Sequence, residues 1–306
     1  MWFKNLQLYR FTKPFILSAE DLAEQLMSRA FKPCGSQETS SFGWVPPIAD
    51  GEDFIHAANG YMMLCGQRQE RVLPAAVVND HVAEQVKELQ EKEGRPVGRK
   101  ERKDLKEEAL FDLLPKAFTR SQKQFAYIAP KEGLLIIDAA SATKADFLQS
   151  FLRDTLGTLP VVPVVAKNIP QHVMTHAVQE GSLAGFELGH ECELRSTLDE
   201  KTVIRCKHQD LGASEISSHI ENGMFVSKLG LQWRGGIECV VDDKLMIKRL
   251  KFADAIQEKA DQANAETQAE QFDVDFSIMT LELSAFISEL FSAFGGEDLA
   301  ALEAAA

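Results

Sequence analysis

Four short segments of the chain combine several basic side chains with few or no acidic ones. The first, LLPKAFTRSQKQFAYIAPK at residues 113–131, has four bases and no acid among three aromatic rings. Residues 95–106 have six bases and two acids, and residues 201–209 and 244–251 have no acid at all. One charge run is usually only a solvated surface, but Lys and Arg that follow a phosphate backbone displace its condensed counterions. Together the four segments predict phosphate binding without readout of base edges.

The charge of the chain is unevenly distributed. Its formal net charge is −13, yet residues 254–306 alone contain twelve acids and one base. Residues 1–253 therefore carry only −2 of that charge, which leaves room for local positive surface. The acidic total does not exclude nucleic acid as a partner.

Motifs of the common enzyme classes do not occur in the sequence: there is no GxSxG, no phosphate loop, no HExxH and no GxGxxG. One arrangement resembles a metal-dependent nuclease, because Glu238, Asp242 and Lys244 could hold magnesium and orient water. Asp242 also suits a plain hairpin turn, which is the simpler interpretation. His190 and Cys192 lack further ligands nearby, so we expect neither a metal nor a cofactor.

The cysteines and the apolar segments indicate in which cellular compartment the protein is expected. Five scattered cysteines without a CxxC pair argue against a disulfide framework and against structural zinc, and they favour a reducing cytoplasm. No signal peptide is visible in MWFKNLQLYR. The apolar stretch 276–294 contains Glu282 and Glu289, so it is too polar and too short to span a membrane. We expect a soluble cytoplasmic protein with no membrane partner.

Strand and helix patterns come in mixed order without a βαβ repeat, which predicts an α+β fold with mixed, mostly antiparallel sheets. Residues 75–93 and 99–114 have apolar residues at helical spacing around a Gly- and Pro-rich break. Their narrow apolar stripe predicts a protruding, charged helical hairpin on an elongated, curved monomer. The expected parts are an N-terminal α/β part (1–74 and 119–166), the hairpin (75–118), and a C-terminal α+β part (167–306) with an acidic helical end.

Further elements can be placed by pattern. Residues 31–53 are rich in Gly, Ser and Pro and predict a loop, and two short strands are expected at 60–66 and 69–73. GTLPVVPVV, with its two prolines, predicts an edge strand. Three antiparallel strands are expected at 224–233, 236–241 and 245–251. A final helix at 275–294 carries an aromatic stripe that suits the core or, as a second interpretation, a subunit interface.

Seven segments in order carry a resemblance to a known family: MWFKNLQLYR, KPCGSQE with GWVPP, LLPKAFTR, LIIDAASATKA, LGTLPVVP, VIRCKHQDL and IKRLKF. From Met1 to about Gly296 the chain resembles the recombination-associated protein RdgC family of proteobacteria. This resemblance implies a non-enzymatic, ring-shaped homodimer that binds double-stranded DNA with little sequence preference and associates with the nucleoid. It also implies that RecA-type recombinases are restrained indirectly, because the protein occupies the DNA.

The resemblance assigns roles to particular residues. Lys116, Phe118 and Arg120 lie in the family's pattern LLP-basic-AF-x-R, near a ring-closing contact or the central hole, and Phe118 is the expected dimer contact. Arg205, Lys207 and Gln209 match a second family pattern, basic-x-K-basic-Q-D-L. The candidate DNA-binding residues are Lys116, Arg120, Lys123, Arg205, Lys207, His208, Gln209, Lys248, Arg249 and Lys251.

His208 departs from the family pattern, which tends to have Lys or Arg at this position. With an ordinary pKa of about 6.5, a histidine here is mostly neutral at neutral pH. We therefore expect a weaker or more pH-dependent contribution from this strip. Two other classes of function stay open: a metal-dependent nuclease at Glu238, Asp242 and Lys244, and a protein-binding module that contacts the recombinase directly.

Overall fold

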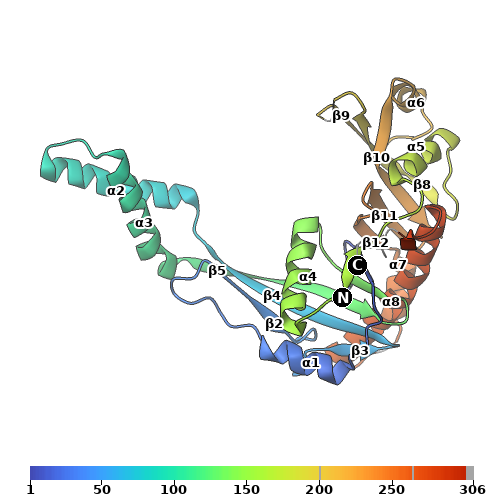
Figure 1. Ribbon diagram of the computed structural model, residues 1–306, viewed down its shortest axis with the longest axis horizontal. Helices are drawn as coiled ribbons and strands as arrows, with labels where there is room; N and C mark the ends of the chain where they lie inside the picture. The colour runs from blue at the N-terminus through green and yellow to red at the C-terminus, as the bar shows by residue number, and fades with distance from the viewer. Residues whose placement is uncertain (200, 264, 301–306) are drawn as a thin grey trace. The chain divides into compact units, whose positions relative to one another are not determined.

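The computed structural model describes residues 1–199, 201–263 and 265–300 (Figure 1). In this part of the chain, helices and strands follow one another in mixed order, and the named strands pair antiparallel in two sheets. The predicted α+β class is confirmed.

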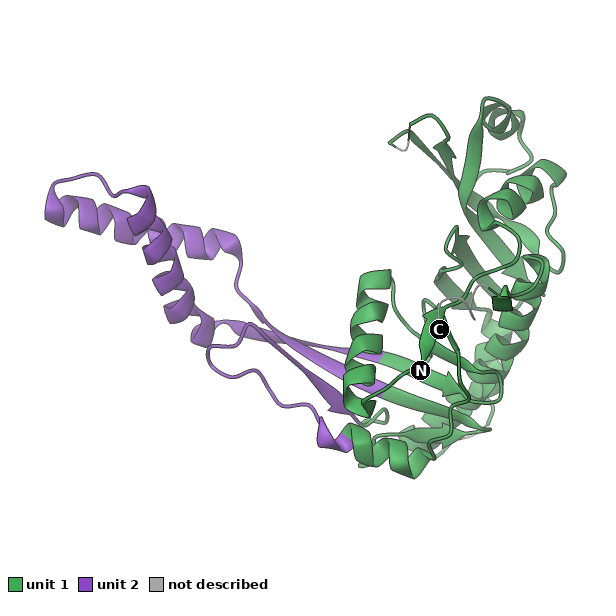
Figure 2. Ribbon diagram, viewed as in Figure 1, with its two compact units in different colours: residues 1–26, 46–64, 125–306 green, residues 27–45, 65–124 purple. Residues whose placement is uncertain are grey.

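The chain divides into two compact units (Figure 2). Unit 1 comprises Met1–Leu26, Pro46–Leu64 and Phe125–Ala306, and unit 2 comprises Met27–Val45 and Cys65–Gln124. The three-part division expected from the sequence, and the curvature of the monomer, stay predictions. Residues 301–306 of the expected C-terminal part lie outside the described residues.

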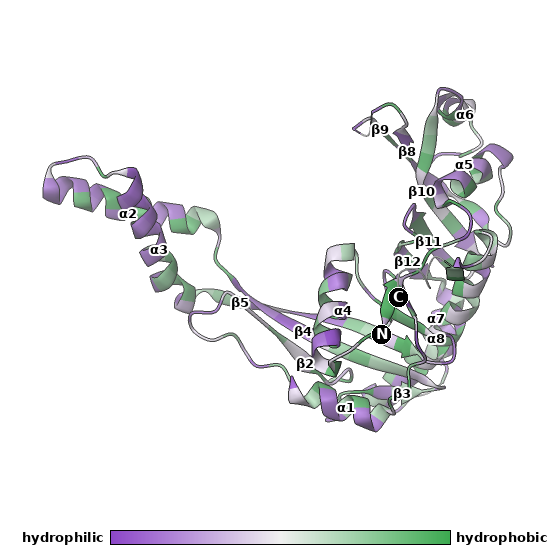
Figure 3. Ribbon diagram, viewed as in Figure 1, coloured by the Kyte–Doolittle hydropathy of each residue, from purple (hydrophilic) through white to green (hydrophobic). Residues whose placement is uncertain are grey.

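Unit 2 contains the helical hairpin. Helices α2 (Ala75–Glu93) and α3 (Arg99–Leu113) have almost the predicted bounds, because Gly94 caps α2 in the left-handed region at φ 65°. Only Val78 and Val86 of α2 and Ala109 of α3 are buried, and both helices are largely hydrophilic (Figure 3). The narrow apolar stripe is confirmed, whereas the protrusion of the hairpin stays a prediction. A 3-10 turn, η1 (Leu114–Lys116), follows α3.

Two strands that lie wholly or partly in unit 2 correct two predictions. Residues expected to form a loop contain β2 (Ser40–Val45), and the two expected short strands are one, β4 (Tyr61–Val72), which pairs with β2. Glycine in β2 is required by packing rather than by a turn, because a Cβ on Gly43 would lie 2.3 Å from the Cα of Phe31. The Gly- and Ser-rich composition of residues 31–53 therefore predicts a loop, although Gly43 is needed there because β2 packs closely against the backbone of Phe31.

Strand β5 (Phe118–Ala129) begins six residues before the predicted start. Its first six residues are exposed and its last four are buried, so that only the second half has the apolar character of a core strand. In unit 1 the pairing runs from β5 to β6 (Leu134–Ile137), then to β1 (Gln7–Phe11) and β7 (Val161–Pro163). The proline-containing β7 is an edge strand, as predicted.

The remaining elements of this part cover or extend the sheet. Helix α1 (Ala19–Ser28) begins at Ser18, whose Oγ accepts a hydrogen bond from the Asp21 N–H at 3.1 Å. Helix α4 (Ala142–Leu156) begins in the same way at Ser141. The short β3 (His56–Ala58) pairs with the first residues of β4.

Unit 1 also contains a five-stranded sheet with the order β12-β11-β10-β8-β9. Its strands are β8 (Glu187–Ser196), β9 (Val203–Lys207), β10 (Met224–Trp233), β11 (Ile237–Asp242) and β12 (Ile247–Phe252). Alternate residues such as Leu194, Leu229 and Val241 are buried in the core. Helices α5 (Pro170–Glu180), α6 (Ser214–Glu221) and α7 (Asp254–Asp261) each contribute residues to this core.

Helix α8 (Gln268–Ala293) begins earlier than predicted, with a capping box between Thr267 and Glu270. By length and composition alone, it is the one helix in the described residues that could cross a membrane, so the expectation that this stretch is too short and too polar is wrong on those two criteria. Its apolar residues are core residues, however: Phe276, Met279 and Phe286 are at most 1% exposed. The ring of Phe286 lies 5.8 Å from that of Trp233. The core interpretation of this helix is confirmed.

Candidate nucleic-acid interface

A row of alternating charge crosses the five-stranded sheet. Arg205 on β9 lies opposite Glu193 on β8, which lies opposite Lys228 on β10, which in turn lies opposite Asp242 on β11. The row ends on β12, where Lys248 Nζ lies 2.8 Å from Asp242 Oδ2. Because directly paired residues point to the same side of a sheet, these side chains share one face.

Glu193 is the centre of this row and is 5% exposed. Its Oε2 lies 2.8 Å from Lys228 Nζ and 2.9 Å from Arg205 Nε, while its Oε1 lies 3.1 Å from Arg195 Nη2. Ser227 Oγ donates a further hydrogen bond to Oε1 at 3.2 Å. One carboxylate thus holds three cations from three strands.

These contacts change the acidity of Glu193. Burial alone would raise its pKa, but the hydrogen bonds from Lys228, Arg205 and Arg195 outweigh burial and lower the pKa to about 2. The side chain is therefore charged throughout the physiological range, and the cluster of one anion and three cations is net positive.

The lowered pKa predicts a pH dependence of stability. A carboxyl group whose folded pKa is about 2, against an ordinary 4.5, stabilises the fold above pH 4.5 and loses that contribution as pH falls towards 2. Glu193→Gln should therefore be less stable than the wild type at pH 6, and the difference should shrink between pH 4.5 and 2. Urea unfolding at several pH values measures this. A difference that stays constant over the window would contradict it.

Two hollows lie beside the row. A groove of about 360 Å³ is lined by Lys207, His208, Arg249 and Lys251, together with His190 and acids such as Glu238. A smaller hollow of about 180 Å³ contains Arg205, Lys207, Lys228 and Arg249. Arg249 is anchored there, because its Nη2 lies 2.8 Å from Glu191 Oε1. We call the bases gathered here the cationic face: Arg195, Arg205, Lys207, Lys228, Lys248, Arg249 and Lys251.

The structure thus brings together six of the sequence-predicted residues: Arg205, Lys207, His208, Lys248, Arg249 and Lys251. The backbone N–H of the seventh, Gln209, donates to His190 O at 3.2 Å, at the end of β9. Glu193, Arg195 and Lys228 are not among the residues predicted from the sequence. The only local sign of them is the i, i+2 spacing of charges along ECELR in β8.

The other predicted residues belong to unit 2. Lys116 ends η1, and Phe118, Arg120 and Lys123 lie on the exposed first half of β5. Phe118 is 88% exposed. Arg71 holds the preceding turn, because its Nη1 donates to the carbonyl oxygens of Leu114, Pro115 and Ala117 at 3.0 to 3.3 Å.

The nuclease arrangement is not assembled around one point. Asp242 is 6% exposed, and its Oδ1 accepts hydrogen bonds from the N–H groups of Lys244 and Met246, both at 3.0 Å. These bonds, with Lys248 on Oδ2, are those of a hairpin turn. Glu238 lies four residues away on the same strand, which is roughly 13 Å along β11.

The cysteines and histidines give no sign of a reactive or metal site. Burial raises the pKa of the Cys65, Cys192 and Cys239 thiols to about 12, so these groups stay protonated. In the described ranges, no three His, Cys, Asp or Glu side chains cluster as metal ligands do. His190 lines the groove without a metal-binding partner set.

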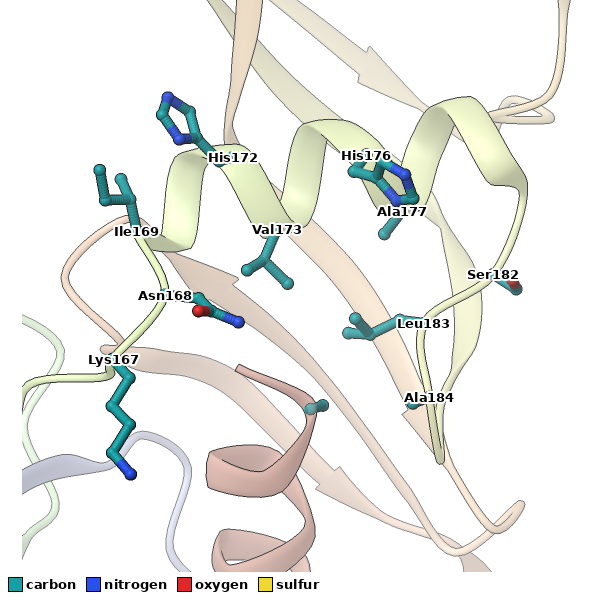
Figure 4. Close-up of a pocket in the computed structure, with 11 residues that line it drawn as sticks. Lys167, Asn168, Ile169, His172, Val173, His176, Ala177, Ser182, Leu183 and Ala184 are labelled. Carbon is teal, nitrogen blue, oxygen red and sulfur yellow. The ribbon is translucent and has the colours of Figure 1, made fainter. Parts of the chain in front are cut away.

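A different hollow, of about 630 Å³, lies along α5 (Figure 4). Val173 and Leu183 point into it, with Asn168 at one end, and Ala177 and Ala293 complete much of its lining. None of the residues predicted to bind DNA lines it. Its lining mixes these apolar residues with Lys167, His172 and His176, and it shares no residue with the cationic face.

Comparisons with known proteins agree over nearly the whole chain. A family profile described as "Putative exonuclease, RdgC" matches residues 1–297. The chain is 47% identical over 300 residues to the recombination-associated protein RdgC of Aeromonas hydrophila, covering 97% of this chain and 99% of the relative. It is 46% identical over 299 residues to that of Tolumonas auensis, with the same two coverages. It is 41% identical over 302 residues to that of Pseudomonas putida, covering 98% and 99%. The chain belongs to the RdgC family.

The RdgC resemblance seen in the sequence is thereby confirmed, and with it an association with recombination. The family profile's description speaks of an exonuclease, whereas the relatives are described only by recombination. In this RdgC family member, the cationic face and the exposed Phe118 are the two surface features described above that suit a binding partner.

Proposed function

We propose that this RdgC family member is a non-enzymatic protein of the cytoplasm and nucleoid that binds double-stranded DNA without sequence preference. In this proposal it acts as a ring-shaped homodimer and restrains RecA-type recombinase activity by occupying DNA. The observation that carries the proposal is the cationic face, where seven bases from four of the five strands (β8, β9, β10 and β12) lie on one side of a sheet.

The cationic face suits a phosphate backbone better than a small ligand. Its bases are spread over β8, β9, β10 and β12 rather than converging on one deep pocket, and the only charged residues of β11 between them are acids. Lys207, Arg205 and Lys251 are exposed, and their flexible side chains can follow phosphates without reading base edges. This arrangement supports binding that depends on salt and little on sequence.

The homodimer is supported by apolar side chains that unit 2 leaves in solvent. Phe118 is 88% exposed and Phe111 62%, and the smaller Val72 and Val77 are also exposed. Large exposed aromatics are typical anchors of protein interfaces. We propose that Phe118 contacts a second copy of the chain, as the family resemblance implies, and that the acidic surface elsewhere discourages DNA from the outside.

The nuclease is the first rival, and the family profile's description favours testing it. The pure protein is incubated with labelled duplex DNA and magnesium. We expect DNA that is bound but intact. Cleavage that is abolished by EDTA and by Asp242→Ala would overturn the non-enzymatic proposal.

The second rival is direct contact with the recombinase. If the protein acts by occupying DNA, its inhibition of strand exchange should be relieved by excess duplex DNA. Inhibition that persists when DNA is saturating would favour a protein-binding module instead.

A further inference from the structure

We infer that Glu193 is a positioning residue for DNA binding: it fixes Arg195, Arg205 and Lys228 so that their free N–H groups face the DNA together. This inference rests on the proposed function. It starts from an apparent contradiction, because an acid at the centre of a phosphate-binding face lowers the attraction to DNA.

The geometry resolves this contradiction. Arg205 uses only Nε for Glu193, and in the described part of the chain neither of its Nη groups has another hydrogen-bond partner. Lys228 uses one of its three N–H donors. The side chain of Arg205 is 67% exposed, that of Arg195 41% and that of Lys228 30%, so all three remain accessible. Each cation is held by the carboxylate and still has donors for a phosphate.

Glu193 is itself held in place by a buried neighbour, Ser227. The side chain of Glu193 is 5% exposed, and the single O–H of Ser227, a residue that is 2% exposed, is shared between the backbone oxygen of Glu193 at 3.1 Å and its Oε1 at 3.2 Å. Long basic side chains lose rotamer entropy when they bind DNA. A carboxylate that has already ordered three of them removes part of that cost before DNA arrives.

A buried ion cluster is weak grounds for a role in stability alone, since apolar residues often serve as well. If Glu193 orders the three cations, Glu193→Gln should change DNA affinity in the direction opposite to the one expected from net charge alone. The substitution makes the protein less negative, which by charge alone would strengthen DNA binding. The positioning role instead predicts weaker binding by about tenfold and a shallower salt dependence, because the cations no longer act together.

The test measures the affinity for a random-sequence duplex over a range of salt for the wild type, Glu193→Gln and Glu187→Gln. Glu187 is an exposed residue of the same strand with no ion pair in the described residues. Glu187→Gln therefore removes the same charge as Glu193→Gln but breaks no ion pair. Glu187→Gln should bind as tightly as the wild type or slightly tighter. If Glu193→Gln behaves in the same way, the inference is wrong and Glu193 only screens charge.

A second variant tests the inference in case Glu193→Gln does not fold. Ser227→Ala changes no charge and lies too deep to meet DNA, so any effect on affinity passes through Glu193. We expect binding about two- to threefold weaker, with an unchanged far-UV spectrum; unaltered affinity would overturn the inference. The proposed function fails separately, if charge reversal of Lys207 and Lys251 leaves DNA binding unchanged.

Discussion

Reversing the charge of two exposed lysines, Lys207→Glu with Lys251→Glu, is expected to weaken duplex DNA binding on the order of 50- to 100-fold at about 0.1 M salt. Both side chains line the groove of the cationic face, and neither has an ion-pair partner in the described residues. Each phosphate contact that is lost should lower the slope of log affinity against log salt by about 0.9. The double variant should therefore show a slope shallower by about two.

The control reverses two exposed lysines of unit 1 that do not belong to the cationic face, Lys13→Glu with Lys259→Glu. This variant has the same net charge as the first. We expect its affinity to fall only slightly, through the long-range field, and its salt slope to stay that of the wild type. Equal losses in both double variants would mean that net charge, and not this face, determines binding.

The second large effect concerns the homodimer. Phe118→Ala should weaken the contact between two copies at least about 30-fold, since truncating a central aromatic anchor costs about 2 kcal/mol or more. A symmetric contact contains the residue twice, which increases the loss. Stability of the monomer should hardly change, because a side chain that is 88% exposed contributes little to the core.

Sedimentation velocity over a range of concentrations, beside thermal unfolding, measures both quantities for Phe118→Ala. An opened ring or separated monomers would sediment more slowly than the wild type at the same concentration. Leu198→Ala is the matched control, because Leu198 is another apolar side chain that is 95% exposed, but in unit 1. Unaltered sedimentation together with a lower melting temperature would make Phe118 an ordinary structural residue.

The sequence predicts those helices and strands whose bounds depend on residues close together in the chain. The bounds of α2 and α3 follow from apolar spacing and from the break that begins at Gly94, and the edge position of β7 follows from its prolines. The basic segments at 201–209 and 244–251 are predicted from composition, and several of their basic side chains, among them Arg205, Lys207 and Lys251, lie on one sheet face. Each of these features depends on residues that are close together in the sequence.

The features that sequence reasoning missed depend on contacts between distant residues. Strand β2 lies where the sequence predicts a loop, because its Gly and Ser content gives no sign of the close approach of Phe31 to Gly43. The role of Glu193 depends on register, which places Arg205 and Lys228 opposite it from strands 12 and 35 residues away. Single charges on separate strands give no signal until the pairing of the sheet is known.

In the function that we propose, the protein binds duplex DNA through the DNA's phosphate backbone as a closed ring. The most direct test measures affinity for linear and covalently closed circular duplexes of the same sequence from about 50 to 200 mM salt. If about eight phosphates are neutralised, log affinity should fall with log salt at a slope of roughly −7, and association with the closed circle should be slower because the ring must open. A flat salt dependence, or identical association with both forms, would contradict the account.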